Sequence, residues 1–116
     1  MRKTPLEQFL NTAIGTSGTL ASLLLLVDRA IVLLKESQQD VGARPENLRK
    51  VRNILAQLQM ALNFKAGDVP RNLFFLYDYL YEELQVGDDL SLDGSLRLLG
   101  QLRDTLAELK RKDRRG

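Results

Sequence analysis

The sequence predicts an all-α protein, an antiparallel four-helix bundle with a short N-terminal accessory helix. Three observations lead to this fold class. Apolar residues recur with the helical period throughout the chain, strand signals are nearly absent, and short polar connections separate four long amphipathic segments. A length of 116 residues suits one domain, so residues 1–116 are expected to form a single bundle.

The accessory helix is predicted near the N-terminus. Thr4 suits the N-cap and is followed by Pro5 and, three residues after Thr4, by Glu7, which together form a capping box. The glycine-containing segment 15–18 then breaks the helix. Residues 1–18 are therefore interpreted as an N-terminal arm that packs on the outside of the bundle.

The second predicted helix, residues 19–37, has more apolar side chains than one core-facing stripe requires. The expected stripe consists of Leu20, Leu23, Leu24, Val27, Ala30, Ile31 and Leu34. Two further pairs lie outside it, Leu25 with Val32 and Leu26 with Leu33. A helix that is apolar nearly all round is either central or covered by something else, so these pairs are candidates for contact with a partner.

The remaining helices are predicted at residues 45–64, 68–86 and 91–110, with connections at 38–44, 65–67 and 87–89. Asp68 is suited to the N-cap of the helix that follows it, where Pro70 is tolerated in the first turn. Gly94 and Gly100 weaken the helical propensity of the last segment.

Five of the seven aromatic residues fall in residues 72–81. The expected core face of this helix contains Leu73, Leu76, Tyr77, Leu80, Tyr81 and Leu84. Phe75 and Tyr79 point to the opposite side, where an exposed aromatic pair is a candidate docking surface. The alternatives are that a loop or the N-terminal arm covers the pair, or that it is simply solvent-exposed.

Composition argues against most kinds of catalysis. The chain has neither Cys nor His, which removes disulfides, the usual zinc sites and the usual general base near neutral pH. Glu82-Glu83 resembles half of a di-iron site, but such sites require a His. No nucleophile and base occur in a recognisable setting. The sequence therefore indicates a binding protein rather than an enzyme, with no cofactor or metal.

The charge is unevenly distributed. Residues 110–116 contain five basic and one acidic residue, which leaves 12 basic and 14 acidic residues in the rest of the chain. This tail is interpreted as a frayed, solvated helix end, since basic side chains suit the negative end of a helix dipole. Contact with RNA or a membrane surface is the alternative, although the aromatics lie beside acidic residues, which disfavours nucleic acid.

Targeting signals are not recognisable. Glu7 and Gln8 precede any apolar run, so the N-terminus does not read as a signal peptide. The most apolar stretch, residues 20–34, is 15 residues long and contains Asp28-Arg29, too short and too charged to insert across a membrane. A cytoplasmic location is expected.

Several segments resemble one known family. Leu76-Tyr77-Asp78-Tyr79, preceded by Asn72-Leu73, resembles the "NL..LYDYM" signature of the flagellin export chaperones, the FliS family. In the same order, residues 24–31, 50–58 and 102–104 resemble the family's "LMLYDGAI", "KAQNIIQEL" and "LRDAW" segments. The chain departs from the family at several places. Residues 16–20 lack the Pro and acid of "TASPE", and Phe9 and Val27 replace Tyr, while Leu106 replaces Trp.

The resemblance implies a cytoplasmic chaperone of type III secretion that binds the disordered C-terminal segment of flagellin and prevents premature polymerisation. The bound segment would become helical and wrap round the bundle. The expected partner-binding residues are Phe9, Leu25, Leu26, Val32, Leu33, Phe75 and Tyr79. The alternatives are a FliS-like co-chaperone or regulator of flagellar assembly, with another flagellar protein as partner, and an unrelated helical interaction module.

The N-terminal arm has an apolar face of its own. Leu6, Phe9, Leu10 and Ala13 recur at helical spacing. We expect this face to cover part of the surplus apolar surface in the free protein, with Phe9 as its anchor.

Overall fold

A computed structural model describes residues 20–62, 64–66 and 68–115. In that part of the chain the helices are α2 (Leu20–Gln39), α3 (Arg44–Met60), α4 (Asp68–Val86) and α5 (Asp89–Arg115), with 3-10 turns at Val41–Ala43 and Phe64–Ala66. These residues form no strand. The predicted all-α class is confirmed, and the predicted accessory helix lies outside the described residues.

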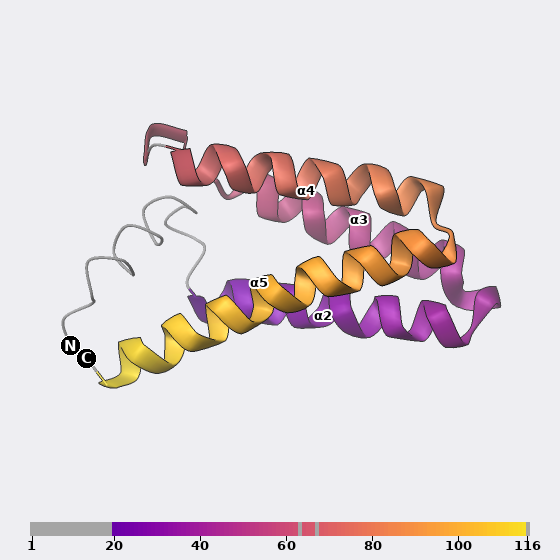
Figure 1. The fold of residues 1–116 in the computed structure, drawn as a ribbon, viewed down its shortest axis with the longest axis horizontal. Coiled ribbons are helices and arrows are strands. Elements are labelled where there is room, and N and C mark those ends of the chain that lie inside the picture. The colour runs from indigo at the N-terminus through magenta and orange to yellow at the C-terminus, as the bar shows by residue number, and fades with distance from the viewer. Residues whose placement is uncertain (1–19, 63, 67, 116) are drawn as a thin grey trace.

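The four helices run alternately up and down along one axis (Figure 1). Helix α2 packs against α3 and α5, and α4 packs against the same two helices from the other side. Helices α2 and α4 are therefore diagonal neighbours in the bundle. This arrangement confirms the predicted antiparallel four-helix bundle.

The core is built from all four helices. Its buried apolar side chains are Leu23, Val27, Ala30, Leu33, Leu34, Leu48, Val51, Ile54, Leu55, Leu58, Tyr77, Leu80, Leu84, Leu92, Leu99 and Leu106. The placement of Leu33 outside the core stripe was wrong, because its side chain is only 2% exposed. Helix α3 covers this flank of α2, and Asn47 Nδ2 donates a hydrogen bond to the Leu33 carbonyl at 3.3 Å.

The ends of α3 and α5 differ from the predicted ones. Helix α3 ends at Met60, before a 3-10 turn, whereas the pattern predicted an end near Phe64. Helix α5 begins at Asp89 and continues to Arg115, through most of the basic tail. At its start the Ser91 backbone N–H donates to Asp88 Oδ1 at 2.8 Å, and the hydrogen bonds from Ser91 hold the pKa of Asp88 below its usual value.

The turn between α4 and α5 requires a glycine. Gly87 has a φ of 68°, a conformation that other residues rarely adopt. A Cβ at this position would also lie 2.9 Å from Leu48 Cδ1. The chain therefore turns at Gly87 and Asp88, where both the backbone and the core beneath it fix the turn, whereas Asp89 of the predicted turn already belongs to α5.

Arg44 joins three helix ends where α3 begins. Its Nε donates to the Ser37 carbonyl at 3.2 Å, its Nη1 to the Gly87 carbonyl at 3.4 Å, and its Nη2 to Asp89 Oδ1 at 3.0 Å. Asp89 is highly exposed, so this ion pair alone contributes little. The two carbonyl contacts link the ends of α2 and α4, and the contact with Asp89 links the start of α5.

Tyr77 makes stability depend on pH in the alkaline range. Burial raises the pKa of its hydroxyl from 10.0 to about 12. Above pH 10 the tyrosine ionises in the unfolded chain but not in the folded protein, so stability should fall as the pH rises toward 12. The free energy of unfolding should be measured with urea from pH 9 to 11.5. Over this range the stability of Tyr77→Phe relative to the wild type should increase by about 2 kcal/mol. Parallel curves would contradict this.

The two faces of α4 should respond differently to truncation. Leu80 is fully buried, so Leu80→Ala should lower the free energy of unfolding by about 2–5 kcal/mol. Tyr79 is 54% exposed, and Tyr79→Ala should cost much less, within about 1 kcal/mol. Chemical denaturation of both variants makes the comparison. An unfolded Tyr79→Ala protein would show that the face assignment is wrong.

Candidate partner-binding surfaces

Part of the apolar surface of the described residues lies outside the core, and two regions of it contain residues that the sequence predicted as partner-binding. One is a groove between α2 and α5, called the α2–α5 groove below, and the other is the outer side of α4, called the α4 face. The α2–α5 groove is lined by Asp28, Ile31, Val32, Lys35, Gln38, Leu96, Gly100, Arg103 and Asp104. The α4 face is defined by the exposed Phe75, Tyr79 and Val86.

The α2–α5 groove has an apolar floor. Its volume is about 690 Å³, and its apolar lining residues are Ile31 and Val32 of α2 and Leu96 of α5. Gly100 borders open space in the groove, because a Cβ built on this residue meets no atom within 4 Å. A second hollow of about 270 Å³ lies between the same two helices, lined by Leu24 of α2 and Ala107, Lys110 and Arg111 of α5. Apolar surface therefore recurs along the α2–α5 contact.

An ion pair connects the two walls of the groove. Arg103 Nε lies 3.0 Å from Asp28 Oδ1, and Arg103 Nη1 lies 3.5 Å from Asp104 Oδ1. The hydrogen bond with Asp28 holds the pKa of Arg103 above its usual value. Both side chains of the Asp28 pair remain more than 40% exposed, so the pair contributes little to folding. Solvent access leaves these charges available to a polar group of a bound segment.

The four partner-binding residues that the sequence predicted on α2 differ in how far their side chains are exposed. Leu25 is 71% exposed and Val32 is 46% exposed, whereas Leu26 is partly buried and Leu33 is buried. Val32 lines the α2–α5 groove and Leu25 lies two turns earlier on the same side of the helix. Leu33 cannot contact a partner without disturbing the core. The predicted Phe9 lies outside the described residues.

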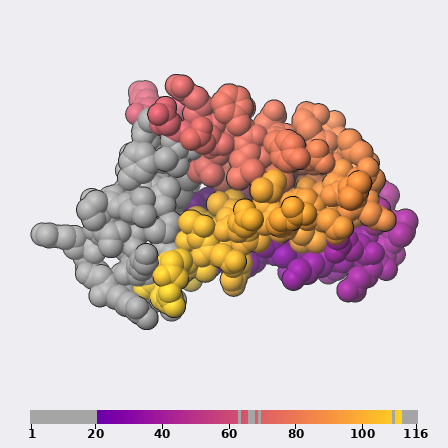
Figure 2. All heavy atoms as spheres, in the orientation of Figure 1, coloured from indigo at the N-terminus to yellow at the C-terminus, as the bar shows by residue number. Residues whose placement is uncertain are grey.

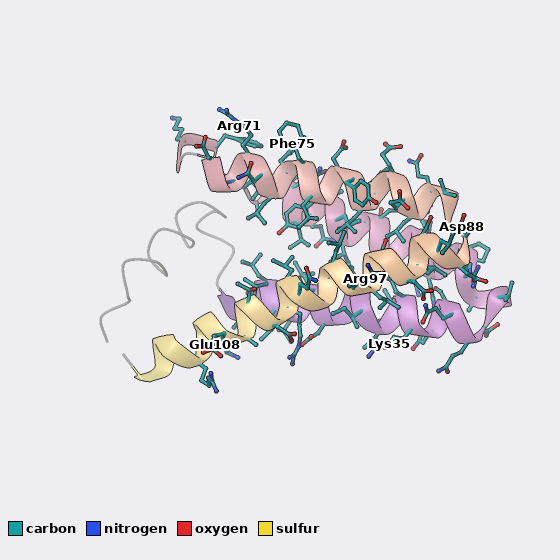
Figure 3. All side chains as sticks on the ribbon, viewed as in Figure 1. Lys35, Arg71, Phe75, Asp88, Arg97 and Glu108 are labelled. Atoms are coloured by element: carbon teal, nitrogen blue, oxygen red, sulfur yellow. The ribbon has the colours of Figure 1, made fainter. Side chains whose placement is uncertain are left out.

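The residues predicted on α4 form the second surface. Phe75 is 61% exposed and projects away from the other helices, one turn from the 54% exposed Tyr79 (Figure 3). Phe74 supports Phe75 by an edge-on contact with ring centroids 6.0 Å apart, and Phe64 contacts Phe74 in the same way at 5.7 Å. Phe75 is therefore held by a small aromatic cluster, and Phe75 and Tyr79 both keep more than half of their surface exposed.

Sequence reasoning missed several groove residues. Ile31 was assigned to the core stripe, and Gly100 was noted only as a weak helix former. Their position beside the groove depends on how α2 and α5 pack. The pairing of Arg103 with Asp28, 75 residues apart, gives no signal in the local pattern.

The described residues contain neither a cluster suited to a metal ion nor a helix suited to crossing a membrane. No cluster of three or more acidic side chains in that part of the chain is arranged to hold a metal ion. None of the helices α2 to α5 combines the length and apolar character needed to cross a membrane.

Comparison with known proteins places the chain in a family. Comparison with curated proteins and with solved structures gives no significant match. The family model described as flagellar protein FliS matches residues 2–113, nearly the whole chain. The chain therefore belongs to the FliS family of flagellar proteins, a chaperone family, and this membership supports a role in flagellar export.

Proposed function

We propose that the protein is a cytoplasmic chaperone of type III flagellar export that binds the disordered C-terminal segment of flagellin and keeps it from polymerising. The observation that carries this proposal is the α2–α5 groove in a chain of the FliS family. Its lining residues extend along α2 from Asp28 to Gln38 and along α5 from Leu96 to Asp104, and a run of helix surface of this kind suits the docking of a peptide segment.

A segment that folds on binding needs particular features in its receptor. Ordering the segment costs conformational entropy, which burial of apolar side chains along a groove must offset. An amphipathic helix laid on the groove would place its apolar residues on Ile31, Val32 and Leu96. The polar rim of the groove would contact its flanks, with Lys35 and Gln38 contributed by α2.

We assign the partner-contacting residues as follows. Leu25, Leu26 and Val32 contact the flagellin segment along α2, and Phe9 anchors the arm that competes with the segment for this surface. Phe75 and Tyr79 contact a partner on the α4 face. Leu33 is not included, because it is buried in the core.

A variant that fills the groove tests the assignment. Gly100→Leu should lower the affinity for a flagellin C-terminal peptide by about tenfold or more, because the new side chain occupies the open space above Gly100. Gly94→Leu is the matched control, since its Cβ also meets no atom within 4 Å but Gly94 does not line the groove. Calorimetry should show a negative heat-capacity change when the wild type binds the peptide. This change should be smaller for Gly100→Leu and unaltered for Gly94→Leu.

Two outcomes would contradict the proposal. If the wild-type protein does not bind the cognate flagellin segment at tens of micromolar protein, the partner is another flagellar assembly protein. If both glycine variants bind as the wild type does, the segment does not lie in the α2–α5 groove.

Deletion of residues 1–14 tests the expected role of the arm. If the arm and the partner compete for the same apolar surface, the truncated protein should bind the flagellin peptide more tightly or faster, and it should aggregate more readily. Parallel titrations of the full-length and truncated proteins make the comparison. Weaker binding after truncation would mean that the arm contributes contacts to the partner instead of masking its site.

A further inference from the structure

We propose that the α4 face is a second, independent docking site for a basic amphipathic helix of a protein partner, and that it can be occupied while the α2–α5 groove is occupied. The proposal does not depend on flagellin binding to the groove. It is carried by the position of the face, its apolar stripe and its unpaired charges.

The apolar stripe has helical register. Phe75, Tyr79 and Val86 follow at intervals of four and seven residues, so their Cα positions fall within an arc of about 40° round the helix. Their exposed fractions are 61%, 54% and 69%. The stripe is about 17 Å long at 1.5 Å per residue, which matches three turns of a partner helix. Figure 2 shows the α4 side chains along the upper edge of the molecule.

The acidic side chains of α4 differ from those of the other described residues in their hydrogen-bond and ion-pair partners. Each acidic side chain described outside α4 has a hydrogen-bond or ion-pair partner. Among the described residues, by contrast, no such partner is found for the acidic side chains of α4, namely Asp68, Asp78, Glu82 and Glu83. Arg71 is the single basic residue of the helix. The helix therefore presents a surplus of uncompensated negative charge.

These charges lie beside the apolar stripe. At 100° per residue Asp78 and Glu82 flank it on one side, and Glu83 flanks it on the other. Asp78 and Glu82 are exposed. A complementary partner has apolar residues one turn apart and Lys or Arg on both sides of them. Such charges favour the encounter and select against acidic partners.

A second copy of this chain fits the face less well. Two α4 faces brought together would place Asp78, Glu82 and Glu83 of each copy near the same acidic set, with only Arg71 to compensate. The occupant of the α2–α5 groove is also a poor match. The groove carries two acidic and two basic side chains, Asp28 and Asp104 with Lys35 and Arg103, and lies between α5 and α2, the helix diagonal to α4.

The test uses a synthetic helical peptide of about 18 residues, with Leu along one stripe and Lys or Arg on both flanks, and fluorescence anisotropy with the full chain. The peptide should bind with an affinity that falls as salt rises. The double variant Phe75→Ser with Tyr79→Ser should weaken binding about tenfold or more. Asp78→Asn with Glu82→Gln should weaken it about threefold to tenfold and flatten the salt dependence.

Two control variants leave the α4 face unchanged. Asp40→Asn with Asp93→Asn removes the same number of charges away from α4 while retaining the side-chain oxygens that accept hydrogen bonds. Gly100→Leu fills the groove. Both proteins should bind the peptide within about twofold of the wild type, because their α4 faces are unchanged.

Three results would overturn the proposal. Equal losses in the α4 and control charge variants would show that the attraction is non-specific. Loss of binding in Gly100→Leu would place the basic peptide in the groove. A concentration-dependent dimer in sedimentation that Phe75→Ser dissolves would make the α4 face a self-association surface.

Discussion

Each helix of a four-helix ring can bury only the side chains that face its neighbours, and this limit governs how the molecule uses its apolar residues. One fully buried leucine from each helix marks the centre, Leu34 on α2, Leu55 on α3, Leu80 on α4 and Leu99 on α5. Helices α2 and α4 carry more apolar residues than this geometry can enclose. Leu25, Val32, Phe75 and Tyr79 therefore remain at the surface after the core is complete.

The α2–α5 groove depends on how the bundle is closed at one end. Arg44 holds the ends of α2 and α4 and the start of α5 together, and Gly87 permits the tight turn above Leu48. With that end fixed, α5 crosses α2 so that Gly100 opens a space beside Val32, and Arg103 reaches Asp28. The groove is thus a consequence of helix packing, whereas the α4 face follows from the sequence of a single helix.

This difference explains what the sequence could and could not predict. The helical period predicted the four helices, the buried Tyr77 and Leu80, and the outward Phe75 and Tyr79, because each depends on spacing within one helix. It failed for Leu33, since the width of the buried face of α2 depends on the approach of α3. It also gave no indication that Gly100 and Arg103 would lie beside Val32, because residues about 70 positions apart meet only in the folded bundle.

The central claim is that the surplus apolar surface binds the partner while the core keeps its packing. Methyl-resolved NMR during a titration with the flagellin C-terminal segment tests this claim most directly. The methyl signals of Ile31, Val32 and Leu96 should shift as the segment is added. Those of Val51 and Leu55, which are fully buried in α3, should stay in place. Shifts confined to the core methyls, with the groove methyls unchanged, would contradict the account and show that the partner binds by opening the bundle.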